Sequence, residues 1–340
     1  GTLVALGAVY YLFGEIDLDS RIPDLSEYNW VLYVSSVVMG IMLLTNFSAG
    51  FVNSGALGGS PNGLWMENLE YMEEETPEGS VVLSWWDYGY WFESIGRRSA
   101  VADGGNSGYY SSGDKVNLPL ADFLTSSNPE NHTDFLRKHS VDYIVLDQTM
   151  IGKYSAVSQI SNRDNSEFRS MLQLSTTRNI RDSISRDSEN NTVVRFSRGG
   201  IGIYLPVEVS QSGVEISRDT PPTLEANGRG RIDCVLTPEG RVDYDVEDTN
   251  TLPSRIFGGQ GGSQEVCVAV NPYNNLERAF GTAGTGRESS ARAVLVPKDI
   301  SRSTLVRLYL MDGQGIDFVE KVEEGSPFGY VKMWKVDLEA

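Results

Sequence analysis

The chain has 340 residues, which is enough for a sizeable core and for two domains with additional segments. Its formal net charge is −18, so the basic patch that phosphate binding requires is not expected, and neither is a nucleic-acid partner. Two histidines and two cysteines exclude most metal sites and most Ser/His or Cys/His nucleophilic schemes.

The balance of charged residues is typical of a protein that works in concentrated salt. Of the 28 basic residues, 21 are Arg and only 7 are Lys. At 1 M salt the Debye length is about 3 Å, so a dense acidic surface repels itself little. The composition therefore predicts a halophilic protein, with an ordinary acidic protein as the alternative.

The N-terminal part, residues 1–55, has the pattern of transmembrane segments joined by a short loop. No charged residue occurs from Tyr28 to Met66, and the apolar run from Trp30 continues for about the 20 residues that a spanning helix needs. The uncharged first stretch, GTLVALGAVYYLFG, begins without Met and predicts the end of another spanning helix in a larger multi-pass protein. A buried helix of a soluble domain is the alternative.

The next part, residues 56–205 together with 291–340, has the pattern of an α/β core. Ser60 fits a helix N-cap, and Leu64, Met66, Leu69 and Met72 follow at roughly helical spacing. Helix-like stretches then alternate with short apolar runs at 80–84, 98–102 and 141–146. This alternation predicts a mixed or parallel sheet with flanking helices, and ligands of such sheets bind at the carboxyl ends of the strands.

From about residue 175 short alternating segments separated by Gly, Pro, Asn and Asp predict antiparallel β structure. Residues 206–290 are expected to form a β-rich inserted or peripheral domain with no assigned role. Cys234 and Cys267 lie within it and form a disulfide if this part faces an oxidising compartment; two buried thiols are the alternative. A helix ending near Gly313 and a final strand, YVKMWKVDL, return to the α/β core.

The first candidate site follows the apolar run at 80–84, where the sequence reads WWDYG. One interpretation is an aromatic core cluster that tolerates a satisfied carboxylate. The other is a small pocket, in which Asp87 accepts a hydrogen bond from a ligand hydroxyl between Trp85 and Trp86. Such a pocket selects a neutral hydroxyl ligand, because a ligand without the hydroxyl leaves Asp87 unpaired.

The second candidate site follows the run at 141–146, where the sequence reads DQTMIGK. Asp147, Met150, Lys153 and Val157 have helical spacing, which predicts that they share one helix face. An apolar face with one Lys and a leading Asp is unusual for a plain core. The alternative is that Lys153 extends along the surface toward solvent.

These motifs resemble those of a known family. WWDYG after a membrane helix resembles the signature of the catalytic subunit of asparagine-linked oligosaccharyltransferases, and DQTMIGKYSAV is similar to the archaeal form of the family's second motif. Val157 stands where Ile or another branched apolar residue is usual. The segment RLYLMDGQGIDF and the final YVKMWKV are similar to the closing helix and strand of the archaeal soluble domain, so the resemblance covers most of the chain outside 206–290.

The resemblance implies an acceptor-recognition role. Such enzymes transfer an oligosaccharide from a dolichol-type lipid-linked donor to the Asn of Asn-X-Ser/Thr sequons. Trp85, Trp86 and Asp87 would bind the Ser or Thr hydroxyl, and Met150 and Lys153 would lie beside that pocket. The supporting residues would be Tyr88, Gly89, Asp147 and Val157.

The resemblance also implies what lies outside this stretch of sequence. The family's catalytic carboxylates and its divalent cation, Mg or Mn, belong to the N-terminal membrane part, so no catalytic residue and no metal ligand is assigned here. The expected partners are an acceptor peptide, the lipid-linked donor and the membrane. The expected location is the cell membrane of a haloarchaeon, in a multi-pass protein whose body faces outward.

A membrane-anchored surface or adhesion protein is the competing hypothesis, in which WWDYG is structural core. Solvent exposure of Asp87 and Trp86 at a strand end distinguishes the two hypotheses. An anchored hydrolase is disfavoured, because the sequence lacks an evident base and metal ligands.

Overall fold

The computed structural model describes residues 39, 61–105, 116–161, 168–210, 213–226, 228–247, 249–273, 275–282 and 289–339. The chain divides into two compact units, Gly1–Asn62 and Gly63–Ala340, and nearly all described residues belong to the second. The expected transmembrane segments and the expected Ser60 cap fall outside the described residues. Within the described residues, none of the helices has the length and apolarity that a membrane span requires.

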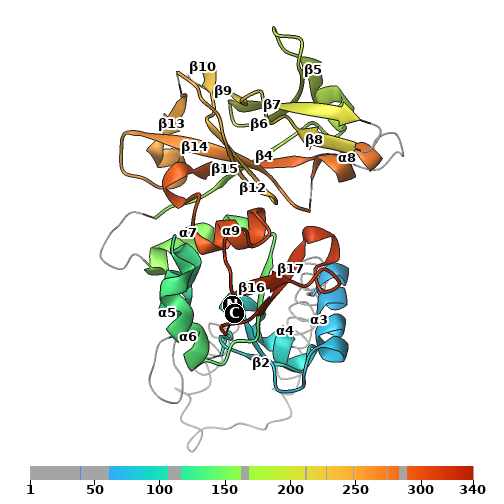
Figure 1. Ribbon diagram of the computed structural model, residues 1–340, viewed down its shortest axis with the longest axis vertical. Coiled ribbons are helices and arrows are strands. Elements are labelled where there is room, and N and C mark those ends of the chain that lie inside the picture. The colour runs from blue at the N-terminus through green and yellow to red at the C-terminus, as the bar shows by residue number, and fades with distance from the viewer. Residues whose placement is uncertain are drawn as a thin grey trace, which may run out of the picture. The chain divides into compact units, whose positions relative to one another are not determined.

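The first sheet has five strands in the order β16-β17-β3-β1-β2 (Figure 1). β1 pairs in parallel with β2 and β3, whereas β17 runs antiparallel to β3 and to β16. The sheet is therefore mixed, as the sequence pattern allowed. The strand bounds are β1 Val81–Leu83, β2 Ser99–Ala100, β3 Tyr143–Asp147, β16 Val319–Lys321 and β17 Val331–Val336.

Helices flank this sheet, with α3 and α5 on opposite sides in Figure 1. All five residues of β3 are buried, as expected for a strand covered on both faces. The helices that surround it are α3 Gly63–Glu75, η1 Trp86–Tyr88, α4 Gly89–Ser94, α5 Asn117–Thr125, η2 Pro129–His132, α6 Thr133–Lys138, α7 Met150–Ser161, η5 Lys298–Ile300, α9 Thr304–Leu310 and η6 Pro327–Gly329.

The buried face of α3 differs from the one that helical spacing suggested. Its buried residues are Trp65, Asn68, Leu69 and Met72. The polar Asn68 is inside because its side-chain amide donates to the Gly325 carbonyl oxygen at 2.6 Å. The prediction was therefore right for Leu69 and Met72, whereas Leu64 and Met66 are only partly buried.

The second sheet has twelve strands and a separate core cluster. Its main path is β10-β9-β7-β6-β4-β15-β14-β11-β12, and all its pairings are antiparallel except β11 with β14. Its strands are β4 Leu172–Ser175, β5 Ile184–Arg186, β6 Thr192–Arg198, β7 Ile201–Ser210, β8 Gly213–Ile216, β9 Thr223–Glu225, β10 Arg229–Arg231, β11 Cys234–Thr237, β12 Gly240–Asp243, β13 Thr251–Pro253, β14 Ser263–Val270 and β15 Arg292–Pro297.

This β-rich sheet is wider in sequence than the expected range of 206–290. It begins at β4 and ends at β15, because strands before residue 206 and after residue 290 pair into the same sheet. A boundary at 206 would also divide β7. Three short helices accompany the sheet: η3 Ile180–Ser183, η4 Ser254–Phe257 and α8 Leu276–Thr282.

A disulfide joins Cys234 on β11 to Cys267 on β14. Both side chains are fully buried, and their Cα atoms lie 4.8 Å apart. Of the two alternatives left open by the sequence, the bonded pair is the one present. It fastens the parallel pairing of β11 with β14, an arrangement that cannot be closed by a tight hairpin.

A buried lysine anchors the closing strand of the first sheet. Lys332 on β17 is 2% exposed, and its Nζ donates to the Asp312 carboxylate and, at 2.8 Å, to the Tyr309 carbonyl oxygen. Lys321 Nζ binds the same carboxylate at 3.1 Å. Burial raises the pKa of Asp312, but the two lysines outweigh it and hold that pKa below its usual value. Burial lowers the pKa of Lys332 to about 8.

We expect Asp312→Asn to reduce the free energy of unfolding by about 3 kcal/mol at pH 7, because it leaves the buried Lys332 without its counter-ion. Asn keeps the size of the side chain and tolerates the positive φ of 48° at this position. Urea denaturation of both proteins measures the difference. The difference should shrink as the pH falls below the ordinary carboxyl pKa of 3.8, because the wild-type Asp312 then becomes neutral too.

The double variant Asp312→Asn with Lys332→Met serves as the control, since it removes the buried charge together with its partner. We expect it to be more stable than Asp312→Asn alone. Equal stability of the two variants would show that the ion pair does not hold the closing strand.

Candidate functional site

The two motif loops meet because β1 and β3 are parallel neighbours. The carboxyl ends of parallel neighbours lie at the same edge of the sheet, so the loops that follow them emerge side by side. Lys153 Nζ lies 2.6 Å from Asp87 Oδ2, and both side chains are 28% exposed. The structure thus brings the charged residues of the two sequence motifs into one ion pair at the surface.

Asp87 keeps one oxygen available. Its Oδ2 is held by Lys153. Within the described ranges, no hydrogen bond is made by its Oδ1. The carboxylate is therefore neither sealed inside nor saturated by its own backbone, and it can accept a hydrogen bond from an external donor.

Tyr88 connects the ion pair to the interior. Its hydroxyl receives a hydrogen bond from Lys153 Nζ at 2.7 Å and donates one to Asp147 Oδ1 at 2.7 Å. The lysine nitrogen also lies 4.3 Å from the centre of the Tyr88 ring, a cation–π distance. Burial, followed by the neighbouring Asp147 charge, raises the pKa of Tyr88 far above its usual value, so the hydroxyl keeps its proton.

Asp147 is a buried carboxylate whose acceptor sites are occupied. Its Oδ2 accepts from Trp65 Nε1 at 3.1 Å, and its Oδ1 accepts from the Thr149 backbone N–H at 3.1 Å and from the Thr149 hydroxyl at 2.7 Å. With the bond from Tyr88, these contacts offset the cost of burying the charge. Asp147 thus orients the loop between β3 and α7.

Asp147 does not share a helix face with the other residues of the second motif. It is the last residue of β3, and α7 begins at Met150, so the expectation that helical spacing starts at Asp147 was wrong. Met150 and Val157 are fully buried on α7, whereas Lys153 reaches the surface. The apolar members of the motif therefore fix the helix against the core while Lys153 faces Asp87.

The two tryptophans of the first motif lie at different depths. Trp85 is 3% exposed and belongs to the core, whereas Trp86 is half-buried and packs against that core. Their ring centres are 6.3 Å apart with the planes tilted by 45°. Of this pair, Trp86 is the one that can offer ring surface to a ligand beside Asp87.

Gly89 is required for close packing. A Cβ atom at this position would lie 2.3 Å from the Ala102 carbonyl oxygen and 2.6 Å from atoms of Asp103, closer than any side chain can tolerate. Only glycine lets α4 start this near the loop that follows β2.

Two contributors were not found from the sequence, Trp65 and Thr149. Thr149 lies within the second motif, and its hydroxyl oxygen is 2.5 Å from that of Tyr88. Trp65 lies on α3, and its ring centre is 4.7 Å from that of Tyr88. The helical pattern predicted from the sequence did not include it. The sequence feature that could have identified Trp65 is a large aromatic residue in a helix, with an indole N–H that can donate to a buried Asp.

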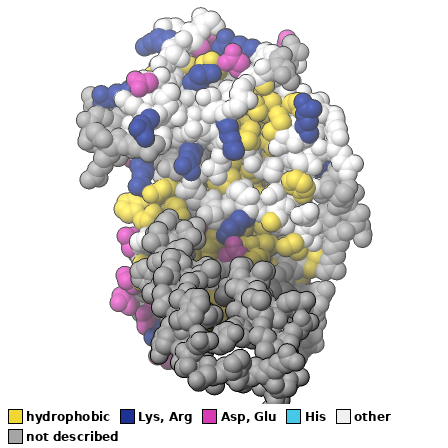
Figure 2. All heavy atoms as spheres, turned by 180° about the vertical axis from the view of Figure 1, so that it is seen from behind, with side chains coloured by type: hydrophobic (Ala, Val, Ile, Leu, Met, Phe, Trp, Pro, Cys, Tyr) yellow, Lys and Arg dark blue, Asp and Glu magenta, His cyan; other side chains and the backbone are white. Residues whose placement is uncertain are grey.

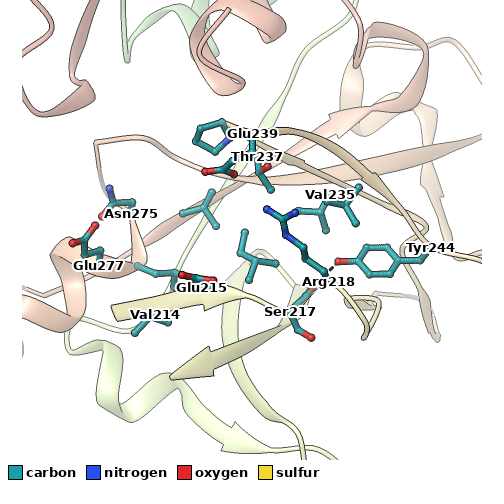
Figure 3. Close-up of a pocket in the computed structure, with 15 residues that line it drawn as sticks. Val214, Glu215, Ser217, Arg218, Val235, Thr237, Glu239, Tyr244, Asn275 and Glu277 are labelled. Atoms are coloured by element: carbon teal, nitrogen blue, oxygen red, sulfur yellow. Dashed lines mark hydrogen bonds between the residues drawn. The ribbon is translucent and has the colours of Figure 1, made fainter. Parts of the chain in front are cut away.

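A separate cavity of about 370 Å³ lies in the β-rich part (Figure 3). Arg218 extends across it toward Val235 and Thr237, and Tyr244 donates to the Ser217 carbonyl oxygen at 2.8 Å. It contains no residue of either motif. The described residues hold no group of three or more His, Cys, Asp or Glu side chains that could bind a metal ion.

We expect Tyr88→Phe to lower the free energy of unfolding by about 1–3 kcal/mol, because the buried Asp147 loses a hydrogen bond that nothing else replaces. Tyr204→Phe is the matched control. It removes a 2.9 Å bond to Glu225 at the surface and should cost less than about 0.5 kcal/mol. Denaturant titration measures both; equal losses would contradict the connecting role of Tyr88.

A family model described as the STT3/PglB/AglB core domain matches residues 78–188. Dolichyl-phosphooligosaccharide-protein glycotransferase 1 of Pyrococcus furiosus is 36% identical over 98 residues, which are 28% of this chain and 9% of that protein. Glycotransferase 3 of Archaeoglobus fulgidus is 30% identical over 130 residues, 29% of this chain and 15% of that protein. The chain thus matches only a small part of the length of these relatives.

Solved structures also align with it. The C-terminal globular domain of an oligosaccharyltransferase from Pyrococcus abyssi aligns with 80% of this chain and 50% of that chain, at 13% identity and a TM-score of 0.40. The C. jejuni PglB C-terminal domain aligns with 81% of this chain and 100% of that chain, at 12% identity and a TM-score of 0.39. By sequence, the segment 78–188, which carries both motif loops, is similar to the core domain of the STT3/PglB/AglB proteins.

Proposed function

We propose that this chain is the acceptor-recognition part of a dolichyl-phosphooligosaccharide–protein glycosyltransferase, and that it binds the Ser or Thr of Asn-X-Ser/Thr sequons. The observation that carries the proposal is the Asp87 carboxylate, which is open to solvent and paired through one oxygen with Lys153. The homology of residues 78–188 supports the enzyme class.

The geometry suits recognition of an alcohol. The hydroxyl of a Ser or Thr donates to the available oxygen of Asp87, and Trp86 lies next to it. Lys153 holds the carboxylate in place, and Tyr88 holds Lys153. A Val in place of Thr has nearly the same shape but no donor, so it leaves the carboxylate unpaired and binds less well.

The chemical step is assigned elsewhere. Recognition of a hydroxyl needs no local nucleophile, which agrees with a chain that has two histidines and no free cysteine in its described residues. We propose that the catalytic carboxylates and the Mg or Mn ligands are not among these 340 residues. They would belong to the multi-pass membrane part of the enzyme, of which residues 1–55 would be one piece. The lipid-linked donor would bind there.

The proposed setting is the outer face of a haloarchaeal cell membrane. The disulfide between Cys234 and Cys267 suits an oxidising exterior, and the scarcity of Lys suits concentrated salt. The competing hypothesis, an anchored surface protein with WWDYG as core, accounts for the burial of Trp85. It offers no reason for a partly exposed ion pair between η1 and α7, the elements that follow the neighbouring strands β1 and β3.

In the full-length enzyme, we expect Asp87→Ala to reduce transfer at least about tenfold, because a hydrogen bond to a charged acceptor contributes roughly 1.5–3 kcal/mol. Asp134→Ala is the control, since the Asp134 side chain is fully exposed on α6. Transfer to a sequon peptide and the Tm of each variant are measured. Wild-type transfer by Asp87→Ala would remove the pocket assignment.

We expect a Thr-to-Val exchange in the acceptor peptide to weaken binding at least about tenfold, since Asp87 loses its donor. Lys153→Met should lower the affinity for the Thr peptide by a smaller factor, because Asp87 remains but is less well fixed. Calorimetric titration with both peptides measures these effects. Equal affinity of the wild-type protein for Thr and Val peptides would contradict hydroxyl recognition.

A further inference from the structure

A polar groove of about 440 Å³ opens beside the ion pair. One wall comes from Gln148 and Thr149 in the loop between β3 and α7 and from Gly152 in the first turn of α7. The other residues are Gln173 on β4, Arg292 on β15, Tyr273 in the segment after β14, and Tyr330 in the turn before β17. Gln148, Thr149 and Gly152 belong to the second motif, but the other lining residues come from four further stretches of chain, so the sequence did not predict the groove.

The groove adjoins the proposed hydroxyl site directly. Thr149 lines it, and the Thr149 hydroxyl lies 2.5 Å from that of Tyr88, the residue that holds Lys153. Gly152 lines it as well and immediately precedes Lys153. An extended peptide advances about 3.3 Å per residue, so a residue one or two positions from a hydroxyl residue bound at Asp87 can reach the groove.

The groove is free of acidic residues, although the chain has 46 of them. Arg292 is exposed, and within the described part of the chain its guanidinium forms no ion pair and no hydrogen bond. Arg278 lies 4.3 Å from the centre of the Tyr273 ring and adds a second cation behind that wall. The charge of Arg292 therefore has no counter-ion among the residues that line the groove.

The β-rich part of the chain around the groove is also much less acidic than the rest. Residues 168–298 contain 15 basic and 16 acidic residues, so nearly all of the net charge of −18 belongs to the rest of the chain. Figure 2 shows Lys and Arg side chains spread over the upper part of one face, which the β-rich sheet forms in Figure 1. An anionic group approaching the motif loops meets least repulsion from this side.

The walls of the groove are firmly held. Tyr273 and Tyr330 pack edge to face with ring centres 5.0 Å apart, and the Gln148 N–H donates to the Tyr330 carbonyl oxygen at 2.9 Å. The buried Tyr309 hydroxyl donates to the Gly329 and Tyr330 carbonyl oxygens at 2.8 and 3.1 Å. A site with fixed walls loses little freedom when a ligand binds.

An exposed aromatic side chain stands next to these walls. Phe328 is 70% exposed and has a φ of 51°, a conformation that non-glycine residues rarely adopt. The Arg278 guanidinium lies 5.6 Å from the centre of its ring. A strained and exposed Phe beside a cationic groove is more useful as a contact for a bound chain than as part of a core.

We infer that this groove is a second acceptor subsite that takes an Asp or Glu side chain one or two residues from the hydroxyl residue. The inference rests on the proposed function. Arg292 provides the planar donor fork that matches a carboxylate, and the Gln148 and Gln173 amides provide further donors. The tyrosines flank the ligand, and Phe328 contacts the peptide beyond it.

The experiment compares sequon peptides that differ only in Glu or Gln, placed in turn at the residue before the hydroxyl residue and at the two residues after it. The full-length enzyme is assayed at the lowest salt at which it remains active, because salt screens an exposed ion pair. We expect wild type to use the Glu peptide about fivefold better, by kcat/KM, at one or more of these positions. In Arg292→Gln the ratio should fall to about one.

Two further variants make the result specific. Arg292→Lys keeps the charge but not the fork and should retain part of the preference. Arg255→Gln removes an exposed arginine at another place in the β-rich part, on η4, and should leave the preference unchanged. The absence of a Glu preference in wild type, or a preference that survives Arg292→Gln, would overturn the subsite.

The outcomes separate this inference from the function on which it rests. If wild type discriminates Thr from Val in the neutral peptide but ignores the flanking charge, only the subsite is wrong. If Thr and Val are used equally, the hydroxyl site itself is wrong, whatever the flanking charge does.

Discussion

The hydrogen bond between Tyr88 and Asp147 is the contact on which the candidate site depends. It joins the first motif to the second underneath the surface, and it is placed there by the parallel pairing of β1 and β3. A buried carboxylate is tolerated only when its acceptor sites are filled, so Asp147 orders the side chains around it. Lys153 is then fixed by Tyr88, and Asp87 by Lys153. The geometry of the partly exposed Asp87–Lys153 pair thus depends on the buried carboxylate of Asp147.

Much of this arrangement could be predicted from short patterns. Three apolar runs ending in polar loops indicated the strands of the first sheet, and their order along the chain placed WWDYG and DQTMIGK at strand ends. The pairing of Asp87 with Lys153 follows from that placement once β1 and β3 are neighbours. Local sequence is sufficient here because each of these runs is short and apolar and is followed directly by a polar or Gly-containing segment.

The remainder depended on information that a local pattern does not contain. Helical spacing does not say where a helix starts, so Asp147 was placed on α7 although it ends β3. Hydrophobicity found Leu69 and Met72 on the buried face of α3 but missed Asn68, which is buried by a bond to a carbonyl 257 residues away. The extent of the β-rich sheet and the groove around Arg292 arise from segments that meet only in three dimensions.

Gly89, which ends WWDYG, has a structural role that is separate from ligand binding. Its place is set by the Ala102 carbonyl, which leaves no room for a methyl group, and Trp85 two residues before Asp87 is interior packing. Three of the five residues, Trp85, Tyr88 and Gly89, are therefore buried in the turn between β1 and α4 and are needed to build it. A match to WWDYG in another sequence therefore indicates first this turn between a strand and a helix. The position of the Asp87 carboxylate depends in addition on Lys153 of α7, which the pentapeptide does not include.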